Sequence, residues 1–270
     1  MASATELGAG RDPIPLQKRL GQHHLLHGAL CRPLVDYLRP QGRLVFEIGP
    51  GGGVLTRELL AVGARVVALE LDRAWGLALG GQRELQAVTV VVGDAMDFDW
   101  QRLPPGTLVT GNLPFNISTA LIERLLACHA RVPRTAFLVQ KEVAERLMAN
   151  PRDPAYGALS VLTAARARVS LLQRVSRGSF RPPPKVEGAF VGLELLSPPL
   201  PEGEMTAFAS TVRLAFSQRR KQLRNSLAAE WGRLAAERVM AAAGLTRRCR
   251  AEELSLEQFL DLHRAHRNRS

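Results

Sequence analysis

The sequence lacks the features of a membrane or secreted protein. Its 270 residues contain no apolar run of eighteen or more residues, which a membrane-spanning helix needs, and its first ten residues have neither the basic nor the apolar segment of a secretory signal. Cysteine is scarce as well, because Cys31, Cys128 and Cys249 are widely scattered and form no C-x-x-C pair. We therefore expect a protein of the reducing cytoplasm with no membrane segment.

Residues that would bind a metal ion are also few. His23, His24 and His27 lie close together, and His23 and His27 are one helical turn apart. Zinc sites, however, use three or four ligands with recognisable partners, which do not accompany these histidines. We expect no metal site.

Acidic residues are too few to balance the basic ones, and the imbalance lies in the C-terminal part. The net charge is +11, of which residues 166–270 carry +9 and residues 1–165 only +2. Solubility does not require such a bias, so we expect a polyanionic partner, with nucleic acid favoured over an anionic membrane surface. Nearly all basic residues are arginines, which suit phosphate; a GC-rich genome would explain that preference but not the sign of the charge.

Apolar runs alternate with helical patterns over most of the chain. With 46% hydrophobic residues the chain can bury a sizeable core, and short β-rich runs between helices predict an α/β fold with a parallel sheet covered on both faces. Strands are expected at residues 44–48, 66–71, 88–92, 108–110 and 135–139, with 167–172 and 188–195 completing the sheet. Helices are expected around residues 53–62, 73–80, 118–129 and 141–149. Prolines at 198, 199 and 201 mark a linker, so we expect a large domain over residues 1–199 and a small helical domain over residues 200–270.

The first expected strand leads into a glycine-rich turn after Glu47. Gly49, Gly51 and Gly53 would let a ligand approach the backbone at the start of the next helix. The dinucleotide fingerprint G-x-G-x-x-G needs a glycine where this sequence has Val54, which argues against an NAD-dependent oxidoreductase. An acid followed by G-x-G-x-G instead resembles the S-adenosylmethionine loop of Rossmann-like methyltransferases.

Polar residues follow three further strand ends. Glu70 closes the second strand, where a carboxylate can accept both hydroxyls of a ribose, and Asp94 after the third strand is placed to accept from an adenine amino group. Each acid alone is more simply a solvated residue. Together with the glycine turn and Asn112, on four successive strand ends, they predict a nucleoside-sized cofactor at one sheet edge.

The segment from Gly111 to Ser118 reads as a loop between a strand and a helix. Asn112 offers a carbonyl oxygen to an exocyclic N–H, Phe115 offers a stacking face, and we expect the Pro114 carbonyl to be free because the turn does not use it. This combination suits a nucleic-acid base taken out of its stack. For the four residues 112–115 alone, an ordinary strand-to-helix turn is the simpler interpretation.

These motifs resemble those of the KsgA/RsmA-type small-subunit ribosomal RNA adenine dimethyltransferases, over nearly the whole chain. The resemblance rests on residues 18–25, 47–56, Glu70, 93–95, 112–115, 180–186 and 216–225. The Asn-Leu-Pro-Phe loop is shared with resistance-conferring methyltransferases of large-subunit RNA, whereas the F-x-x-R-R-K-x-L-R-N segment at 216–225 is typical of the small-subunit enzymes.

The resemblance implies a Rossmann-like class I methyltransferase that transfers methyl groups from S-adenosylmethionine to adenine N6. The implied substrate is a pair of adjacent adenines in the 3′-terminal hairpin of small-subunit ribosomal RNA, in the immature small subunit, and we expect a monomer. The alternatives are a large-subunit RNA methyltransferase and a non-catalytic assembly or transcription factor that kept the fold.

The resemblance also implies the roles of individual residues. Cofactor contacts are implied for Gln22, His23, Leu25, Glu47, Gly49, Gly51, Glu70, Leu71, Asp94, Ala95 and Asn112. Catalysis is implied for Asn112, Leu113, Pro114 and Phe115. Stacking on the target base is implied for Phe115 and Phe180. Contacts to RNA phosphate are implied for Arg219, Arg220, Lys221 and Arg224, although a solvated basic helix would have the same pattern.

Three positions depart from the pattern of this family. His24 stands where phenylalanine is usual, Gln222 where threonine is usual and Gly188 where serine is common. A polar ring at His24 is expected to loosen the segment that closes over the cofactor.

Overall fold

The computed structural model describes residues 23–218 and 221–268. Its centre is a seven-stranded sheet in the order β4-β3-β2-β5-β6-β9-β7. The strands are β2 (Leu44–Ile48), β3 (Arg65–Glu70), β4 (Thr89–Val92), β5 (Leu108–Asn112), β6 (Arg134–Gln140), β7 (Ala167–Val175) and β9 (Gly188–Leu195). The strands from β4 to β6 run parallel, whereas β9 is antiparallel to both of its neighbours. Because the strand order reverses between β2 and β5, their carboxyl ends open a crevice at one edge of the sheet.

Each strand expected from the apolar runs is present; β2 and β9 have the predicted bounds, and the other strands differ at their ends. The difference that matters most for the site is at the end of β5. This strand continues through Gly111 and Asn112, two residues that the sequence pattern placed in a loop. Gly111 lies opposite Phe137 of β6, and Asn112 lies opposite Leu138. Asn112 is therefore held by the sheet ladder itself, so its backbone is more rigid than a loop position would allow.

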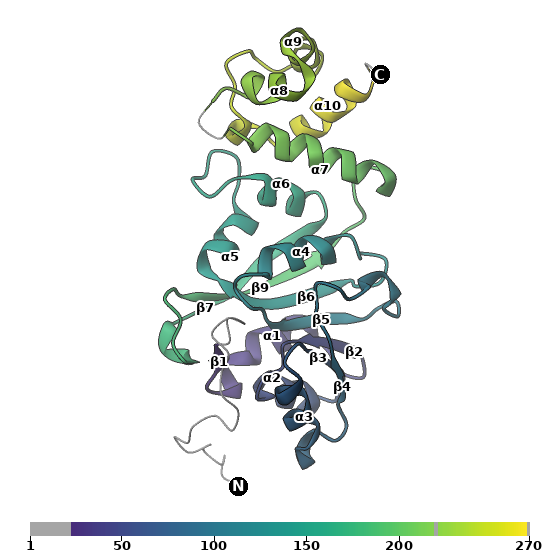
Figure 1. Cartoon of the computed structure of the whole chain (residues 1–270), viewed down its shortest axis with the longest axis vertical. Coiled ribbons are helices and arrows are strands. Elements are labelled where there is room, and N and C mark those ends of the chain that lie inside the picture. Colours follow the sequence, from purple (N-terminus) through teal and green to yellow (C-terminus); the bar gives the residue numbers. More distant parts are fainter. Residues whose placement is uncertain (1–22, 219–220, 269–270) are drawn as a thin grey trace.

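Helices cover both faces of the sheet, as Figure 1 shows. They are α1 (Arg32–Leu38), α2 (Val54–Ala61), α3 (Arg73–Gly80), α4 (Ser118–Leu126), α5 (Lys141–Met148) and α6 (Ala158–Ala164). The sequence pattern did not predict α1 and α6, which have only seven residues each and so give little periodicity.

Alternating residues of the central strands pack against two different sets of helices. Val45 belongs to a core with the apolar residues of α1 and α2, whereas Phe46 belongs to a core with those of α4 and α5. Successive side chains of a strand point to opposite faces, so this division follows from strand geometry. It explains why the buried strands read as continuous apolar runs.

The C-terminal helices form a third core, and Figure 1 shows them at the end of the molecule opposite α2 and α3. They are α7 (Glu202–Phe216), α8 (Leu223–Trp231), α9 (Arg233–Ala242) and α10 (Leu256–Arg267). Phe208 and Phe259 are fully buried here, together with Val161 of α6. The boundary at residues 199 and 200 stays a prediction.

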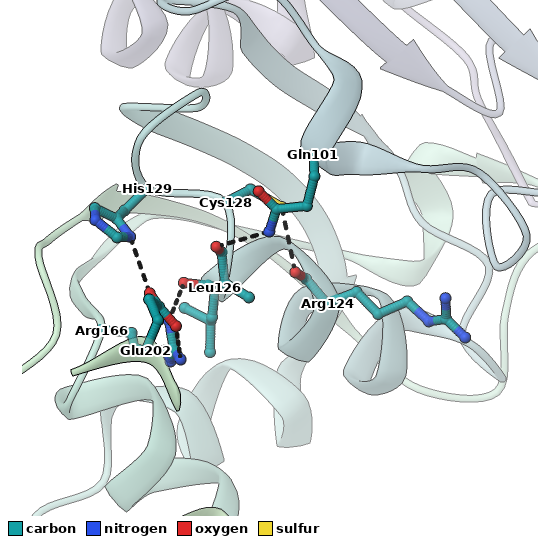
Figure 2. A network of polar contacts seen from close by, with 8 residues as sticks. Gln101, Arg124, Leu126, Cys128, His129, Arg166 and Glu202 are labelled. Atoms are coloured by element: carbon teal, nitrogen blue, oxygen red, sulfur yellow. Dashed lines mark hydrogen bonds and ion pairs between the residues drawn. The ribbon is translucent and has the colours of Figure 1, made fainter. Parts of the chain in front are cut away.

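A polar network joins the start of α7 to the sheet domain, as Figure 2 shows. The Arg166 guanidinium donates to both carboxylate oxygens of Glu202, at 3.0 and 2.8 Å, and to the Leu126 carbonyl at the end of α4, at 3.3 Å. These hydrogen bonds from Arg166 lower the pKa of Glu202, and the His129 ring lies 3.4 Å from the same carboxylate. A bidentate pair fixes the relative orientation of the Arg166 guanidinium and the Glu202 carboxylate as well as their distance. It therefore orients the start of α7, where the chain leaves the sheet.

A two-stranded antiparallel sheet joins distant parts of the chain. It pairs β1 (His24–Leu25) with β8 (Phe180–Arg181), and Figure 1 shows it beside the large sheet. Gln22, Arg219 and Arg220, three of the predicted site residues, lie outside the described residues. Within the described part, no helix is long and apolar enough to cross a membrane.

Candidate active site

The carboxyl ends of β2, β3 and β5, together with the segment after β4, surround one pocket. The pocket is partly open to solvent, and its walls combine apolar side chains with a few polar groups, as is usual for small-molecule sites. The predicted residues that line it are His23, Gly49, Gly51, Glu70, Leu71, Asp94, Ala95, Asn112, Leu113, Pro114 and Phe115. Leu25 and Glu47 line a smaller cavity that shares Gly49, Gly51 and Asn112 with the first. The topology thus gathers residues from 23 to 115 into one site.

The glycine turn needs its glycines for backbone geometry. Gly49, Gly51 and Gly53 have φ angles of 66°, 51° and 79°, a region that side chains disfavour. A Cβ on Gly53 would also lie 2.8 Å from Leu79 and from Leu85. Among the described residues, no side chain caps the N-terminus of α2, which leaves its first N–H groups for a ligand.

Two carboxylates are held in fixed orientations on the pocket wall. Glu70, which is 6% exposed, accepts from the Gly51 N–H at 3.2 Å and the Asp72 N–H at 3.0 Å, and burial raises its pKa. Asp94 accepts from the Met96 N–H at 2.7 Å. Both carboxylates can accept hydrogen bonds from a ligand beside the glycine turn. The hydroxyls and the amino group of an adenosine are donors of the kind that such acceptors bind.

Glu47 is the most buried acid of the site. It is 1% exposed, and its carboxylate accepts from the Thr56 hydroxyl at 2.7 Å. Burial raises the pKa of Glu47 to about 7. Its side chain holds the start of α2 to the end of β2, so it supports the glycine turn from beneath.

The Asn112 amide is tied to the N-terminal segment. Its Nδ2 donates to the His23 carbonyl at 2.6 Å. The His23 ring in turn donates from Nδ1 to the Pro182 carbonyl at 2.8 Å, and its centroid lies 5.7 Å from that of Phe115. With Nδ2 committed to His23, the Asn112 Oδ1 is the amide atom available to accept a hydrogen bond from a ligand.

The expectation of a free Pro114 carbonyl is wrong. This oxygen accepts from the backbone N–H of Ile117 and from that of Ser118, both at 3.1 Å. The turn into α4 therefore uses the carbonyl, because the first N–H groups of a helix need acceptors. Pro114 still lines the pocket, and Asn112 is left as the polar acceptor of this loop.

His24, one of the departures from the family pattern, lies over the glycine turn. Its ring meets Trp75 edge to face with centroids 4.7 Å apart, and a Cβ on Gly51 would lie 3.0 Å from its Nε2. The prediction that this ring loosens the cofactor-covering segment stays a prediction. The sequence reasoning missed Ile48, Leu69 and Ile117 as lining residues. Ile48 ends the strand before the glycine turn, so its position alone could have indicated it.

Some predicted residues do not lie in the pocket. Phe180 is 3% exposed, packs in a core with Leu25 and is not among the residues that line the pocket. Lys221 and Arg224 lie with the C-terminal helices, where Arg224 donates to Glu237 at 3.2 Å. The stacking role of Phe180 and the RNA contacts of the other two residues remain predictions.

The strand order, the glycine turn and the acids at neighbouring strand ends define a class I methyltransferase, whose cofactor is S-adenosylmethionine. The family model "Ribosomal RNA adenine dimethylase" matches residues 15–267, and the chain belongs to this family. The fold, the family resemblance and the cofactor predicted from the sequence are therefore confirmed.

Two relatives support this membership along most of their length. The "Ribosomal RNA small subunit methyltransferase A" of Thiobacillus denitrificans is 39% identical over 245 residues, which cover 90% of this chain and 94% of the relative. The protein of the same name from Methylococcus capsulatus is 41% identical over 255 residues, covering 92% and 96%.

Two solved structures share the fold at lower identity. A dimethyladenosine transferase from Plasmodium falciparum matches with a TM-score of 0.69 and 23% identity, covering 88% of this chain and 96% of that one. The 23S rRNA methyltransferase ErmE matches with a TM-score of 0.63 and 24% identity, covering 87% and 96%.

Proposed function

We propose that this protein methylates N6 of adenine in small-subunit ribosomal RNA, using S-adenosylmethionine, during assembly of the small subunit. The observation that carries the proposal is the Asn112 amide, oriented by the His23 carbonyl at 2.6 Å beside Phe115, in the pocket that holds Glu70 and Asp94. Relatives that are 36 to 41% identical bear the name of a small-subunit enzyme, which favours that substrate over the large subunit.

The residues present fit the cofactor. Glu70 would accept from the ribose hydroxyls, Asp94 from the adenine amino group, and the turn around Gly49 and Gly51 would hold the methionine part. When bound, S-adenosylmethionine supplies a methyl group activated by its sulfonium.

The protein must then make adenine N6 a better nucleophile, because its lone pair is delocalised into the ring. Asn112 Oδ1 would accept a hydrogen bond from an N6 hydrogen, which favours a more tetrahedral nitrogen and aims its lone pair. Phe115 would stack on the base. Positioning and electrostatics account for catalysis in this scheme, and no side chain is needed as a strong general base. A second transfer to the same nitrogen requires only that the pocket tolerates the first methyl group.

We further propose that residues 200–270 form the RNA-contacting helical domain and that the protein acts as a monomer in the cytoplasm. The net charge of +5 over these residues supports contact with phosphate. Arg219, Arg220, Lys221 and Arg224 are the residues that we assign to it. Two neighbouring adenines in the 3′-terminal hairpin are the target that the family resemblance implies.

The test is methyl transfer from labelled S-adenosylmethionine to undermethylated small subunits and, separately, to large subunits, followed by digestion to nucleosides. Dimethyladenosine from small subunits alone is the expected result. Label in large subunits alone would move the protein to the resistance-type branch. Binding to either subunit without methyl transfer would identify an assembly factor. The Asn112→Ala variant is the control that provides the background signal.

A further inference from the structure

The connection between β7 and β9, residues 176–187, lies at the same sheet edge as the pocket. Val175 pairs with Gly188, and Gly188 pairs with Gln140 at the carboxyl end of β6. The Lys141 N–H donates to the Glu187 carbonyl at 3.0 Å. Since β6 is also the neighbour of β5, this connection is two strands away from the end of β5 that carries Asn112.

The connection also touches the segment that lines the pocket. Arg181 of β8 pairs with His24, and the Pro182 carbonyl accepts from the His23 ring at 2.8 Å. Both histidines line the pocket, and Figure 1 shows this end of β7 beside β1. The connection contributes no lining residue itself, but it lies directly beside the two histidines and so borders the pocket on that side.

Four cations lie at the end of β7 and on this connection, with no acidic partner among the described residues. Arg174, Arg177, Arg181 and Lys185, which we call the 174–185 rim, form no ion pair within that part of the chain, and all but the half-buried Arg181 are exposed. The nearest acid in sequence, Glu187, is bound by Lys141 Nζ at 3.2 Å.

Arg168, at the opposite end of β7, does have an acidic partner, because it pairs with Glu194 at 2.8 Å. Arg177 is also held in place, since its guanidinium donates to the Lys185 carbonyl at 3.5 Å. Arg177 and Lys185 line a hollow with the acids Glu142, Glu145 and Glu187, but within the described residues neither cation forms an ion pair with any of them. Residues 174–187 carry four cations against one acid, and such an excess of like charge on one segment attracts a polyanion.

We propose that the 174–185 rim binds the phosphates of the nucleotides next to the target adenosine and holds the RNA strand while the base enters the pocket. This rests on the proposed function, since it assumes that the base in the pocket belongs to RNA. Phosphate contacts set the register of a nucleic acid, and a base can be extruded only from a strand that is held. In Figure 1 α5 and α6 lie between the end of β7 that bears the rim and the C-terminal helices, so the two surfaces would contact different parts of the RNA.

The experiment compares two double variants that remove the same charge. Arg177→Gln with Lys185→Gln alters the rim. Arg168→Gln with Arg102→Gln is the control, because both arginines are exposed and ion-paired, and Arg168 lies at the opposite sheet edge. For each protein, kcat/KM for undermethylated small subunits is measured against KCl concentration at fixed Mg²⁺, with thermal unfolding and calorimetric S-adenosylmethionine affinity as further readouts.

The plot of log(kcat/KM) against log[KCl] has a negative slope, and in the rim variant this slope should become less steep by about 0.7 for each RNA phosphate that the rim no longer neutralises. Its KM should rise while kcat at saturating subunits, cofactor affinity and unfolding temperature match those of the control. An unchanged salt slope in the rim variant, or an equal change in the control, would overturn the proposal. If the parent protein labels no adenine at all, the proposed function fails first, and the slope for binding a hairpin RNA then tests the rim alone.

Discussion

Replacing Gly111 by alanine should disturb the amide of Asn112, which we propose as the catalytic group, from within the sheet. Gly111 pairs with Ile48 of β2, and an added Cβ would lie 2.3 Å from the Ile48 carbonyl oxygen, with two more backbone atoms of Ile48 at 3.1 and 3.2 Å. Ordinary contact begins at 3.4 Å, so β5 must move by about 1 Å. Both clashing groups are backbone, which leaves no side chain to rotate away.

The movement is carried directly to Asn112, the next residue of β5. Its 2.6 Å hydrogen bond to the His23 carbonyl cannot survive a shift of that size without rearrangement. A misplacement of about 1 Å at a catalytic group costs roughly 100-fold in rate, and overpacking costs about 1–3 kcal/mol in stability. We expect Gly111→Ala to fold, to unfold at a lower temperature, and to lose roughly 100-fold in kcat.

The control is Gly192→Ala, another glycine within the sheet. A Cβ there would lie 2.5 Å from the ring of Tyr37 on α1, a side chain that can shift, and Gly192 pairs with Ala136 in the middle of β6. Thermal unfolding, S-adenosylmethionine affinity and single-turnover methyl transfer are measured for both variants. A Gly111→Ala protein with parental kcat, or an equal loss of kcat in folded Gly192→Ala, would refute the reasoning.

Three further predictions concern the site directly. Asn112→Ala should lower kcat by about 100-fold or more while calorimetric affinity for S-adenosylmethionine is kept, and near-normal turnover would contradict its role. Phe115→Ala should weaken RNA binding by about 1–3 kcal/mol, and loss of cofactor binding instead would mean that the ring is structural. Glu47, whose pKa is raised from 4.5 to about 7, should make the folded protein less stable as pH rises through that window, by about 3 kcal/mol in total. Urea unfolding at pH 5 and pH 8 should show this decline in the parent and a smaller one in Glu47→Gln, and equal declines would exclude Glu47 as the cause.

The elements of the pocket could be predicted from the sequence because each depends on short-range information. The strands follow from short apolar runs and the glycine turn from residues without a Cβ, and Glu70 and Asp94 stand out because they lie at or just after the ends of such runs. Parallel strands share an edge for their carboxyl ends, so the common location of these residues was predictable before any distance was known.

The Pro114 carbonyl shows where local reasoning was insufficient. The turn was predicted, but not which backbone N–H groups would need an acceptor, and the start of α4 supplies two of them. Similarly, the strand ends were uncertain because pairing with β6 extends β5 to Asn112, and the sequence of β5 alone does not contain that partner.

The fold class, the glycine turn of the cofactor site and the loop that we propose for base binding could all be recognised along the chain, since each consists of residues that are neighbours in sequence. Three other features exist only once the chain is folded: β8 pairs with β1, His23 joins Pro182 to Asn112, and the cations of the 174–185 rim lie beside the pocket. His23 and Pro182 are 159 residues apart. Contacts over such separations depend on strand order and packing, which no local pattern encodes.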